Sequence, residues 1–192
     1  MTEKLTASSA TPRRGAEIIR LLPSVPRVSL RMRDSGRNAL HTIVGLSLDP
    51  PINRFSSDGE RRAARLGPDE WLIIDAPSNA ETVVSDITKE LAGRFHTLVD
   101  VSSASVSFAI DGPDAANILN AGCPLDLDIN SFPAGSATRT VLGKCQIILF
   151  RLSELEFHLE CWRSYREYVH AFLLEAAALN SSAHTLAKEL HQ

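Results

Sequence analysis

The 192-residue sequence contains no apolar run of the roughly 18 residues that a membrane-spanning helix needs, and its N-terminus lacks the apolar core of a signal peptide. Arg13-Arg14 is therefore not interpreted as a twin-arginine export signal. Cysteine is scarce, because only Cys123, Cys145 and Cys161 occur, too far apart for a disulfide framework or a C-x-x-C metal site. Reduced, buried thiols are typical of cytosolic proteins. We therefore predict a cytoplasmic protein with no membrane partner.

The common catalytic signatures are also missing. Gly143-Lys144 does not fit a phosphate loop, because the preceding glycine is too distant and Cys145 stands where Ser or Thr is required. No serine lies in a G-x-S-x-G elbow, and the six histidines are not spaced with Asp, Glu or Cys as zinc ligands are. Asp126 and Asp128 lack the glycine and terminal glutamate of a calcium loop. We predict no catalytic, cofactor-binding or metal-binding residue in this chain.

Charge is unevenly distributed along the chain. Residues 1–65 hold 12 of the 20 basic residues and 6 of the 23 acidic ones, so the first third carries +6 and the remainder −9. The arginines are dispersed, without a basic helix or interleaved aromatics, which favours a solvated face or an acidic protein partner over nucleic acid. Because the N-terminal segment is poor in large apolar residues, we expect it to become ordered against such a partner, with Arg13, Arg14 and Arg20 in contact.

A repeat is the most informative positive feature. Residues 65–91 align with residues 151–177 at a constant offset of 86, and six of the 27 aligned positions are identical. Each copy reads as a strand, a tight turn, a strand and a helix opened by S-x-x-E, a pattern typical of a helix-capping box. The two boxes are Ser78 with Glu81 and Ser164 with Glu167. The repeat predicts a pseudo-symmetric body, although chance recurrence of a common hairpin-helix pattern is the alternative.

The periodicity predicts the remaining elements. Strands are expected near residues 28–33, 61–66, 71–74, 95–101, 105–110, 136–141, 145–151 and 156–161, and helices near 38–44, 78–92, 113–122 and 164–179. Several hairpins combined with helices indicate an α+β fold with an antiparallel or mixed sheet. We expect an extended or disordered arm over 1–23, one pseudo-symmetric α+β domain over 24–179 with halves of about 25–93 and 94–179, and a tail over 180–192.

One stretch of the second half resembles a known family. The motifs are Val99-Asp100-Val101-Ser102-Ser103, Ile110-Asp111-Gly112-Pro113-Asp114-Ala115, and the hairpin of Leu142-Gly143-Lys144 with Phe150-Arg151-Leu152. They are similar to the folate-binding domain of the glycine-cleavage aminomethyltransferases. The resemblance implies two β-α-α-β-β-β-α halves with exchanged first strands. It also implies a catalytic aspartate four residues before the hairpin aromatic, where this chain has Gln146, an amide that cannot accept a proton.

A second motif resembles a smaller relative of that family. Leu66-Gly67-Pro68-Asp69-Glu70-Trp71-Leu72 is similar to a hairpin of the gamma subunits of heterotetrameric sarcosine oxidase, and the likeness spans roughly residues 25–178. It implies a non-catalytic subunit of a complex that oxidises sarcosine to glycine and hydrogen peroxide and passes the carbon to tetrahydrofolate. It places FAD, FMN, NAD, zinc and tetrahydrofolate in the partner alpha, beta and delta subunits, and none in this chain.

Two other readings stay open at this point. A vestigial folate pocket would make the chain a stand-alone folate-binding or aminomethyltransferase-like one-carbon protein, and Asp100-Val101-Ser102 motivates that reading. An arginine-rich nucleic-acid adaptor would bind with a steep dependence on salt. The subunit reading predicts instead that the purified chain binds no flavin and oxidises no sarcosine.

Overall fold

The computed structural model describes residues 18–33 and 39–189. The first strands are β1 (Ile19–Leu21), β2 (Arg27–Met32), β3 (Thr42–Ile43), β4 (Leu46–Ser47), β5 (Arg54–Asp58), β6 (Arg61–Gly67) and β7 (Glu70–Ile74). There follow the 3-10 turn η1 (Pro77–Asn79), α1 (Val83–Glu90), β8 (His96–Asp100), β9 (Ser105–Asp111), α2 (Ala115–Asn120), β10 (Ser136–Leu142), β11 (Cys145–Arg151), β12 (Glu156–Trp162), the 3-10 turn η2 (Arg163–Tyr165) and α3 (Arg166–Glu189).

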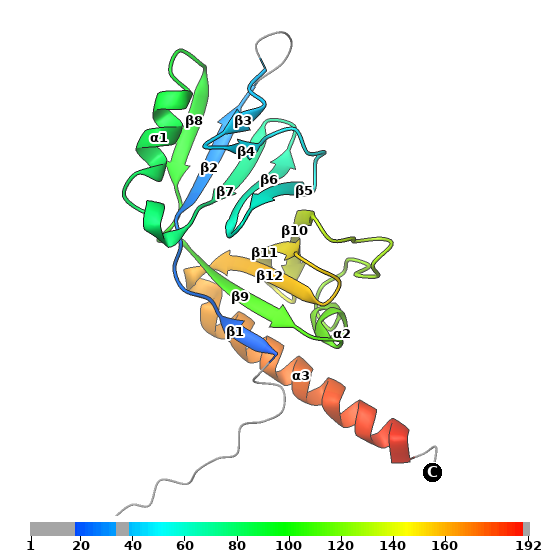
Figure 1. The fold of residues 1–192 in the computed structure, drawn as a ribbon. Helices are drawn as coiled ribbons and strands as arrows, with labels where there is room; N and C mark the ends of the chain where they lie inside the picture. Colours follow the sequence, from blue (N-terminus) through cyan, green and yellow to red (C-terminus); the bar gives the residue numbers. More distant parts are fainter. Residues whose placement is uncertain (1–17, 34–38, 190–192) are drawn as a thin grey trace, which may run out of the picture.

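Ten of these strands form one antiparallel sheet, in the order β1-β9-β12-β11-β10-β5-β6-β7-β2-β8, and β3 pairs with β4 separately. The fold is therefore α+β with a large curled antiparallel sheet. We call residues 27–91 the first half and residues 105–189 the second half. In each half the first strand pairs with the last, so that β2-β7-β6-β5 repeats the order β9-β12-β11-β10. The halves lie one above the other in Figure 1.

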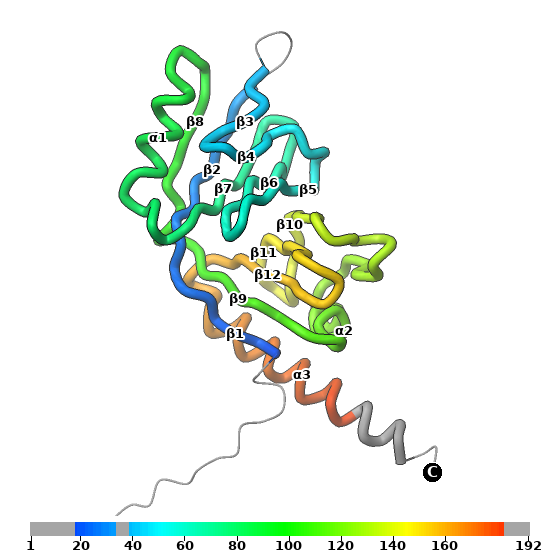
Figure 2. Tube along the Cα trace, viewed as in Figure 1, coloured from blue at the N-terminus to red at the C-terminus, as the bar shows by residue number. Residues whose placement is uncertain are grey.

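The strands that precede each half pair across the repeat. β1 comes before β2 in the chain but pairs with β9, and β8 comes before β9 but pairs with β2. Between the halves, β5 and β10 are registered only at Arg54 and Ser136. Figure 2 shows the two halves of the trace meeting near these strands.

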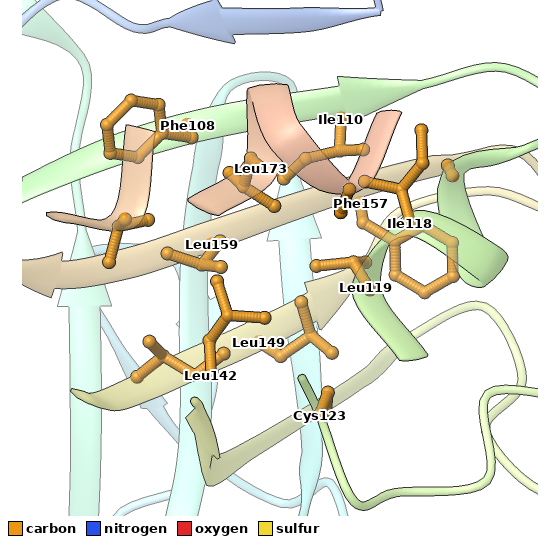
Figure 3. Packing of buried hydrophobic residues seen from close by; sticks show 14 of the residues in the cluster. Phe108, Ile110, Ile118, Leu119, Cys123, Leu142, Leu149, Phe157, Leu159 and Leu173 are labelled. Atoms are coloured by element: carbon orange, nitrogen blue, oxygen red, sulfur yellow. The ribbon is translucent and has the colours of Figure 1, made fainter. Parts of the chain in front are cut away.

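Alternation along the strands divides the apolar residues among three cores, because successive side chains point to opposite faces of a sheet. The second-half core lies beneath α2 and α3 and includes Phe108, Ile118, Phe157, Leu159 and Leu173 (Figure 3). The first-half core lies beneath α1 and the β3-β4 hairpin. Its buried residues include Val28, Leu30, Ile43, Trp71, Ile73 and Ile87.

A third apolar cluster lies between the halves. Leu72 and Ile74 of β7 alternate with the first-half core residues, and they pack with Ala64, Ala137 and Phe150. Residues 71–74 of β7 therefore pack alternately into two cores, and every residue of β7 is buried. Because β5 and β10 share one registered pair, this cluster supplies much of the contact between the halves.

Side-chain packing also repeats at the predicted offset. The Arg65 guanidinium lies 5.4 Å from the ring centroid of Trp71, and the Arg151 guanidinium lies 4.8 Å from that of Phe157. Both are cation–π arrangements, one on each hairpin. In α1 and α3, Val83 and Val169 are likewise both buried.

Some predicted elements are wrong. In place of the helix near residues 38–44, the described residues form the β3-β4 hairpin, with Val44 and Gly45 at positive φ in its turn and Ile43 buried. Between β9 and β10 a single helix, α2, is present. Within residues 27–33 and 39–189, neither half therefore shows the two consecutive helices expected after its first strand. The local apolar residues are buried by a hairpin in one half and by a single short helix in the other.

Both predicted capping boxes are also wrong. α1 begins at Val83, and its N-cap Thr82 makes no side-chain capping hydrogen bond. Ser78 lies instead in the turn η1, which is held by an Asn79 Nδ2 to Asp75 Oδ1 hydrogen bond of 2.9 Å. Ser164 lies in the turn η2, before α3 begins at Arg166.

The ends of the described chain also differ from the expected boundaries. β1 falls inside the expected arm, because Ile19–Leu21 pairs with β9. α3 continues through residues 180–189, where a tail was expected. Within residues 18–33 and 39–189, no helix is long and apolar enough to span a membrane.

Candidate functional site: the cavity between the halves

A cavity of about 330 Å³ opens between the two halves. Ser29 of β2 and Glu70 of β7 contribute from the first half, and Arg139, Gln146 and Trp162 contribute from β10, β11 and β12. Its volume falls at the lower limit of ordinary small-molecule pockets, which are about 300–1,000 Å³. The cavity is therefore the candidate functional site.

Gln146 lies where the family resemblance expects a catalytic carboxylate. It belongs to β11, pairs with Val141 of β10, and lines the cavity with an exposed side chain. The position predicted from the sequence thus does face a cavity. An amide there can hydrogen-bond but cannot act as a proton acceptor at neutral pH.

Glu70 is an acidic residue of the cavity wall, and it is engaged by two arginines. Arg139 Nη1 lies 2.8 Å from Glu70 Oε2, Arg139 Nη2 donates to Oε1, and Arg31 Nη2 lies 3.1 Å from Oε2. The hydrogen bonds from Arg139 lower the pKa of Glu70. The carboxylate is therefore a weaker base than an ordinary glutamate, and it joins β7 of one half to β10 of the other.

Glu160, the second acidic residue of the wall, is engaged by a buried arginine. Arg27 and Glu160 are 1% and 5% exposed. Arg27 Nε lies 2.6 Å from Glu160 Oε2 and Nη2 lies 3.3 Å from Oε1, while Arg27 Nη1 donates to Val25 O at 2.8 Å. Ser107 Oγ contacts both side chains. This ion pair joins β2 of the first half to β12 of the second.

The D-V-S motif shapes the cavity from the turn after β8. Asp100 Oδ1 accepts hydrogen bonds from Ser102 N at 2.8 Å and Ser102 Oγ at 2.6 Å, and these bonds lower the pKa of Asp100. Ser102 Oγ in turn accepts from Arg27 N at 2.8 Å. Val101, between them, lines the cavity. Asp100 and Ser102 therefore have a positioning role, because they fix the start of β2 against the end of β8.

Of the predicted partner-contact residues, the structure describes Arg20, which lies away from this cavity. Arg20, in β1, forms an exposed ion pair with Asp111, with Nη2 2.6 Å from Oδ2. Arg20 is not among the residues that line the cavity. Arg13 and Arg14 lie outside the described residues. The contact of these three arginines with a partner remains a prediction.

Asp126, His170 and His158 have local partners. Asp126 accepts hydrogen bonds from Ser131 Oγ at 2.6 Å and Asp128 N at 3.0 Å, so its carboxylate holds a loop. His170 stacks on Phe108 with ring centroids 5.8 Å apart. Burial, followed by the charge of Arg62, lowers the pKa of His158 to about 4. No three metal-ligating side chains come together among those that the structure describes, in residues 18–33 and 39–182.

The sequence interpretation missed the four charged residues that bridge the halves. A signal existed for Glu160, because it alternates with the apolar residues Phe157, Leu159 and Cys161 and must therefore face away from their core. Glu70 belongs to the Leu66–Leu72 motif and is identical to Glu156 in the repeat, but neither observation indicates a contact between the halves. Neither pattern indicates which residues pair with the glutamates, because Arg27 is 133 residues from Glu160 in the chain and Arg139 is 69 residues from Glu70.

Comparisons with known proteins identify relatives along most of the chain. The model of a family described as "Sarcosine oxidase, gamma subunit family" matches residues 34–179. The gamma subunit of sarcosine oxidase from Arthrobacter sp. is 26% identical over 165 residues, which cover 84% of this chain and 80% of the relative. The gamma subunit from Corynebacterium sp. strain P-1 is 29% identical over 142 residues, which cover 73% of this chain and 69% of the relative.

Two solved structures share the fold. A chain of heterotetrameric sarcosine oxidase from Corynebacterium sp. U-96, in complex with pyrrole 2-carboxylate, matches with a TM-score of 0.75 and 23% identity over 83% of each chain. The glycine cleavage aminomethyltransferase T of Bartonella henselae matches with a TM-score of 0.58 and 15% identity, over 81% of this chain and 45% of the other. At these identities the likeness supports the aminomethyltransferase-like fold alone.

Proposed function

The chain belongs to the sarcosine oxidase gamma subunit family, and we propose that it serves a heterotetrameric sarcosine oxidase without supplying a catalytic group. The complex would demethylate sarcosine oxidatively to glycine, with formation of hydrogen peroxide and methylenetetrahydrofolate. Its alpha, beta and delta subunits would be the partners of this chain. FAD, FMN, NAD, zinc and tetrahydrofolate would be held by those partners.

The observation that carries this proposal is the composition of the cavity between the halves. Gln146 stands where the related transferases are expected to have a catalytic aspartate. The two glutamates in the wall, Glu70 and Glu160, are each engaged by arginine. General acid–base catalysis needs a group that can exchange a proton near the working pH. These carboxylates are better suited to joining the two halves than to chemistry.

The cysteines support a cytoplasmic location for the complex. Cys123, Cys145 and Cys161 are all free thiols, and all three are buried. Burial raises the pKa of Cys161 to about 12, so its reactive thiolate is disfavoured. Unpaired cysteines of this kind suit a reducing compartment.

The test compares the chain alone with the assembled oxidase. The purified chain should show no flavin absorbance near 450 nm and no peroxide formation from sarcosine. In the heterotetramer, Gln146→Ala should leave sarcosine turnover within about twofold of the unmodified complex, because the amide takes no part in a proton transfer. A yellow, active chain, or an intact complex in which Gln146→Ala lowers turnover a hundredfold, would refute the proposal.

A second function, retention of a folate pocket, is favoured by one observation. The cavity of about 330 Å³ combines an exposed Trp162 ring, the guanidinium of Arg139 and apolar Val101, groups able to contact a flat, anionic ligand. Titration with tetrahydrofolate tests this function. Micromolar binding that weakens in Trp162→Ala would support it, and millimolar or absent binding would remove it.

We also propose that the two halves are copies of one unit with exchanged first strands. The crossed pairing of β1 with β9 and of β8 with β2 supports this, as do the matching Arg65–Trp71 and Arg151–Phe157 contacts. Residues 24–179 would then unfold as one domain. A single calorimetric transition agrees with that expectation, and two separate transitions contradict it.

The basic N-terminal segment is proposed to contact an acidic partner through Arg13 and Arg14. Deletion of residues 1–17 removes both arginines and leaves β1 in place. The shortened chain should keep its unfolding temperature but co-purify less well with the other subunits, and more so at higher salt. Unchanged co-purification would remove this contact from the proposal.

A further inference from the structure

The ten-stranded sheet ends in two edge strands, β1 and β8. They occupy corresponding places, because each precedes one half and pairs with the first strand of the other. Figure 1 shows them at opposite ends of the sheet. An edge strand exposes unpaired backbone N–H and C=O groups, and proteins commonly protect such edges by shortness, charge, proline or bulges.

The β1 edge carries two of these protective features. The strand is only three residues long. Its central residue, Arg20, extends a charged side chain that is 56% exposed and paired with Asp111 of β9. A short edge with a charged residue is a poor template for another strand.

The β8 edge is longer, and its one acidic side chain, Asp100, lies at the end of the strand and accepts hydrogen bonds from Ser102. Its five residues include no lysine, arginine or proline. On one face, Thr97 is exposed and Val99 is 48% exposed, and Phe95, just before the strand, is 97% exposed. α1 packs against the other face of the sheet, where Leu98 joins the first-half core. The face of Phe95, Thr97 and Val99 is not part of any of the three cores.

The register shows which backbone groups of β8 point away from β2. Val101 N donates to Arg27 O at 2.9 Å, and Val99 and Thr97 lie opposite Ser29 and Arg31 at intervals of two residues. In an antiparallel ladder, hydrogen-bonded pairs alternate with non-hydrogen-bonded pairs. The N–H and C=O groups of His96, Leu98 and Asp100 are therefore directed to the outer edge. Within residues 18–33 and 39–189, β2 is the only strand paired with β8.

We infer that the outer edge of β8 receives an extended strand from another subunit of the complex. The inference rests on the proposed function, since it requires a heterotetramer. The free backbone groups of His96, Leu98 and Asp100 specify a β-strand as the occupant, as in other cases of strand addition. Apolar side chains at alternate positions of that strand would cover Phe95 and Val99. The proposed occupant is therefore an apolar extended segment of a partner subunit, and pairing of β8 with β8 of a second copy is the alternative that the test separates from it.

The test uses the full chain co-expressed with the alpha, beta and delta subunits, with the affinity tag on a partner. Leu98→Pro removes an outward N–H without removing a hydrogen bond to β2, and Phe95→Asp places a charge on the exposed face. Each should weaken recovery of this chain with the complex about tenfold or more. Leu21→Pro is the matched control at the β1 edge. The hydrogen bonds from Asp111 N to Ile18 O and from Leu22 N to Ser107 O show that the Leu21 N–H also points outward. It should assemble normally.

Hydrogen exchange provides the second measurement, because Leu98→Pro also alters a partly buried side chain. The amides of His96, Leu98 and Asp100 should exchange at least tenfold more slowly in the complex than in the free chain. Unchanged exchange together with normal assembly of Phe95→Asp would overturn the inference and leave the proposed function intact. A dimer of the free chain with protected β8 amides would also overturn it. Failure of the unmodified chain to assemble with these subunits would overturn both.

Discussion

Replacement of Glu160 by leucine should destabilise the protein more than any change in an exposed ion pair. The Glu160 carboxylate accepts from Arg27 Nε at 2.6 Å, and both side chains are buried. Without it, Arg27 retains the carbonyl of Val25 and the hydroxyl of Ser107 but no anionic partner. Breaking one side of a buried ion pair costs about 3–5 kcal/mol. Total stabilities are about 5–15 kcal/mol, so this loss would be a third or more of many such values.

A double replacement separates the cost of an unpaired charge from the value of the pair. In Arg27→Met with Glu160→Leu no charge remains buried, and such exchanges are often nearly neutral. Ser107 loses both charged partners, and an unsatisfied buried hydroxyl costs about 1–3 kcal/mol. The double variant should therefore be more stable than Glu160→Leu alone.

Urea unfolding monitored by tryptophan fluorescence and circular dichroism measures both variants. Arg20→Met, which removes an exposed ion pair with Asp111, is the control and should cost less than about 1 kcal/mol. Equal destabilisation in the single and double variants would refute the argument, because the loss could not then come from an unpaired Arg27. So would a loss below about 1 kcal/mol for Glu160→Leu.

Three further predictions follow from packing and protonation. The pKa of His158 is about 4 in the folded protein against an ordinary 6.5, so between these pH values the folded protein binds fewer protons than the unfolded chain. The free energy of unfolding should therefore fall as the pH is lowered from about 6.5 to 4. Urea titrations should show a smaller fall for His158→Gln. Gly122→Ala would place a methyl group 2.8 Å from a ring carbon of Phe172 and 3.0 Å from a backbone nitrogen, which should cost about 1–3 kcal/mol and lower the calorimetric Tm. The three buried cysteines should react with a thiol reagent at pH 8 only after denaturation, and rapid labelling of the native chain would contradict the described burial.

The sequence predicted those parts of the fold whose cause is local. The hairpin turns at residues 67–69 and 143–144 form where turn residues favour them, and β10 and β11 pair about the predicted turn at Gly143-Lys144. The short antiparallel strands of the second half follow from alternation. The Arg65–Trp71 and Arg151–Phe157 contacts recur at the offset of 86 on which the sequence repeat is aligned.

Elements set by distant contacts could not be predicted in the same way. The S-x-x-E pattern at Ser78 is typical of a helix N-terminus. Here Asn79 is hydrogen-bonded to Asp75 in a turn, and α1 begins only at Val83. The second such site is displaced because the Arg163 backbone and side chain donate to the turn at residues 103–104. The local sequence of residues 38–44 is compatible with a helix, but Ile43 is buried in the first-half core as part of a hairpin.

The candidate cavity shows the same limit. The sequence could indicate one residue of the cavity wall, because counting along a family motif leads to Gln146. It could not predict the charge interactions of the wall, because each glutamate there pairs with an arginine from the opposite half of the chain. Period-2 patterns indicate which face of a strand a charged residue occupies, but its partner depends on how the two halves of the sheet are placed against each other.

The crossed pairing of β1 and β8 has a consequence for the origin of the protein. Under the proposal that the halves are copies of one unit, the outermost strand of each copy completes the sheet of the other. Fusion of a domain-swapped dimer would produce this arrangement. Fusion would make this mutual completion independent of protein concentration, and later sequence changes could then differ between the two copies without loss of the pairing.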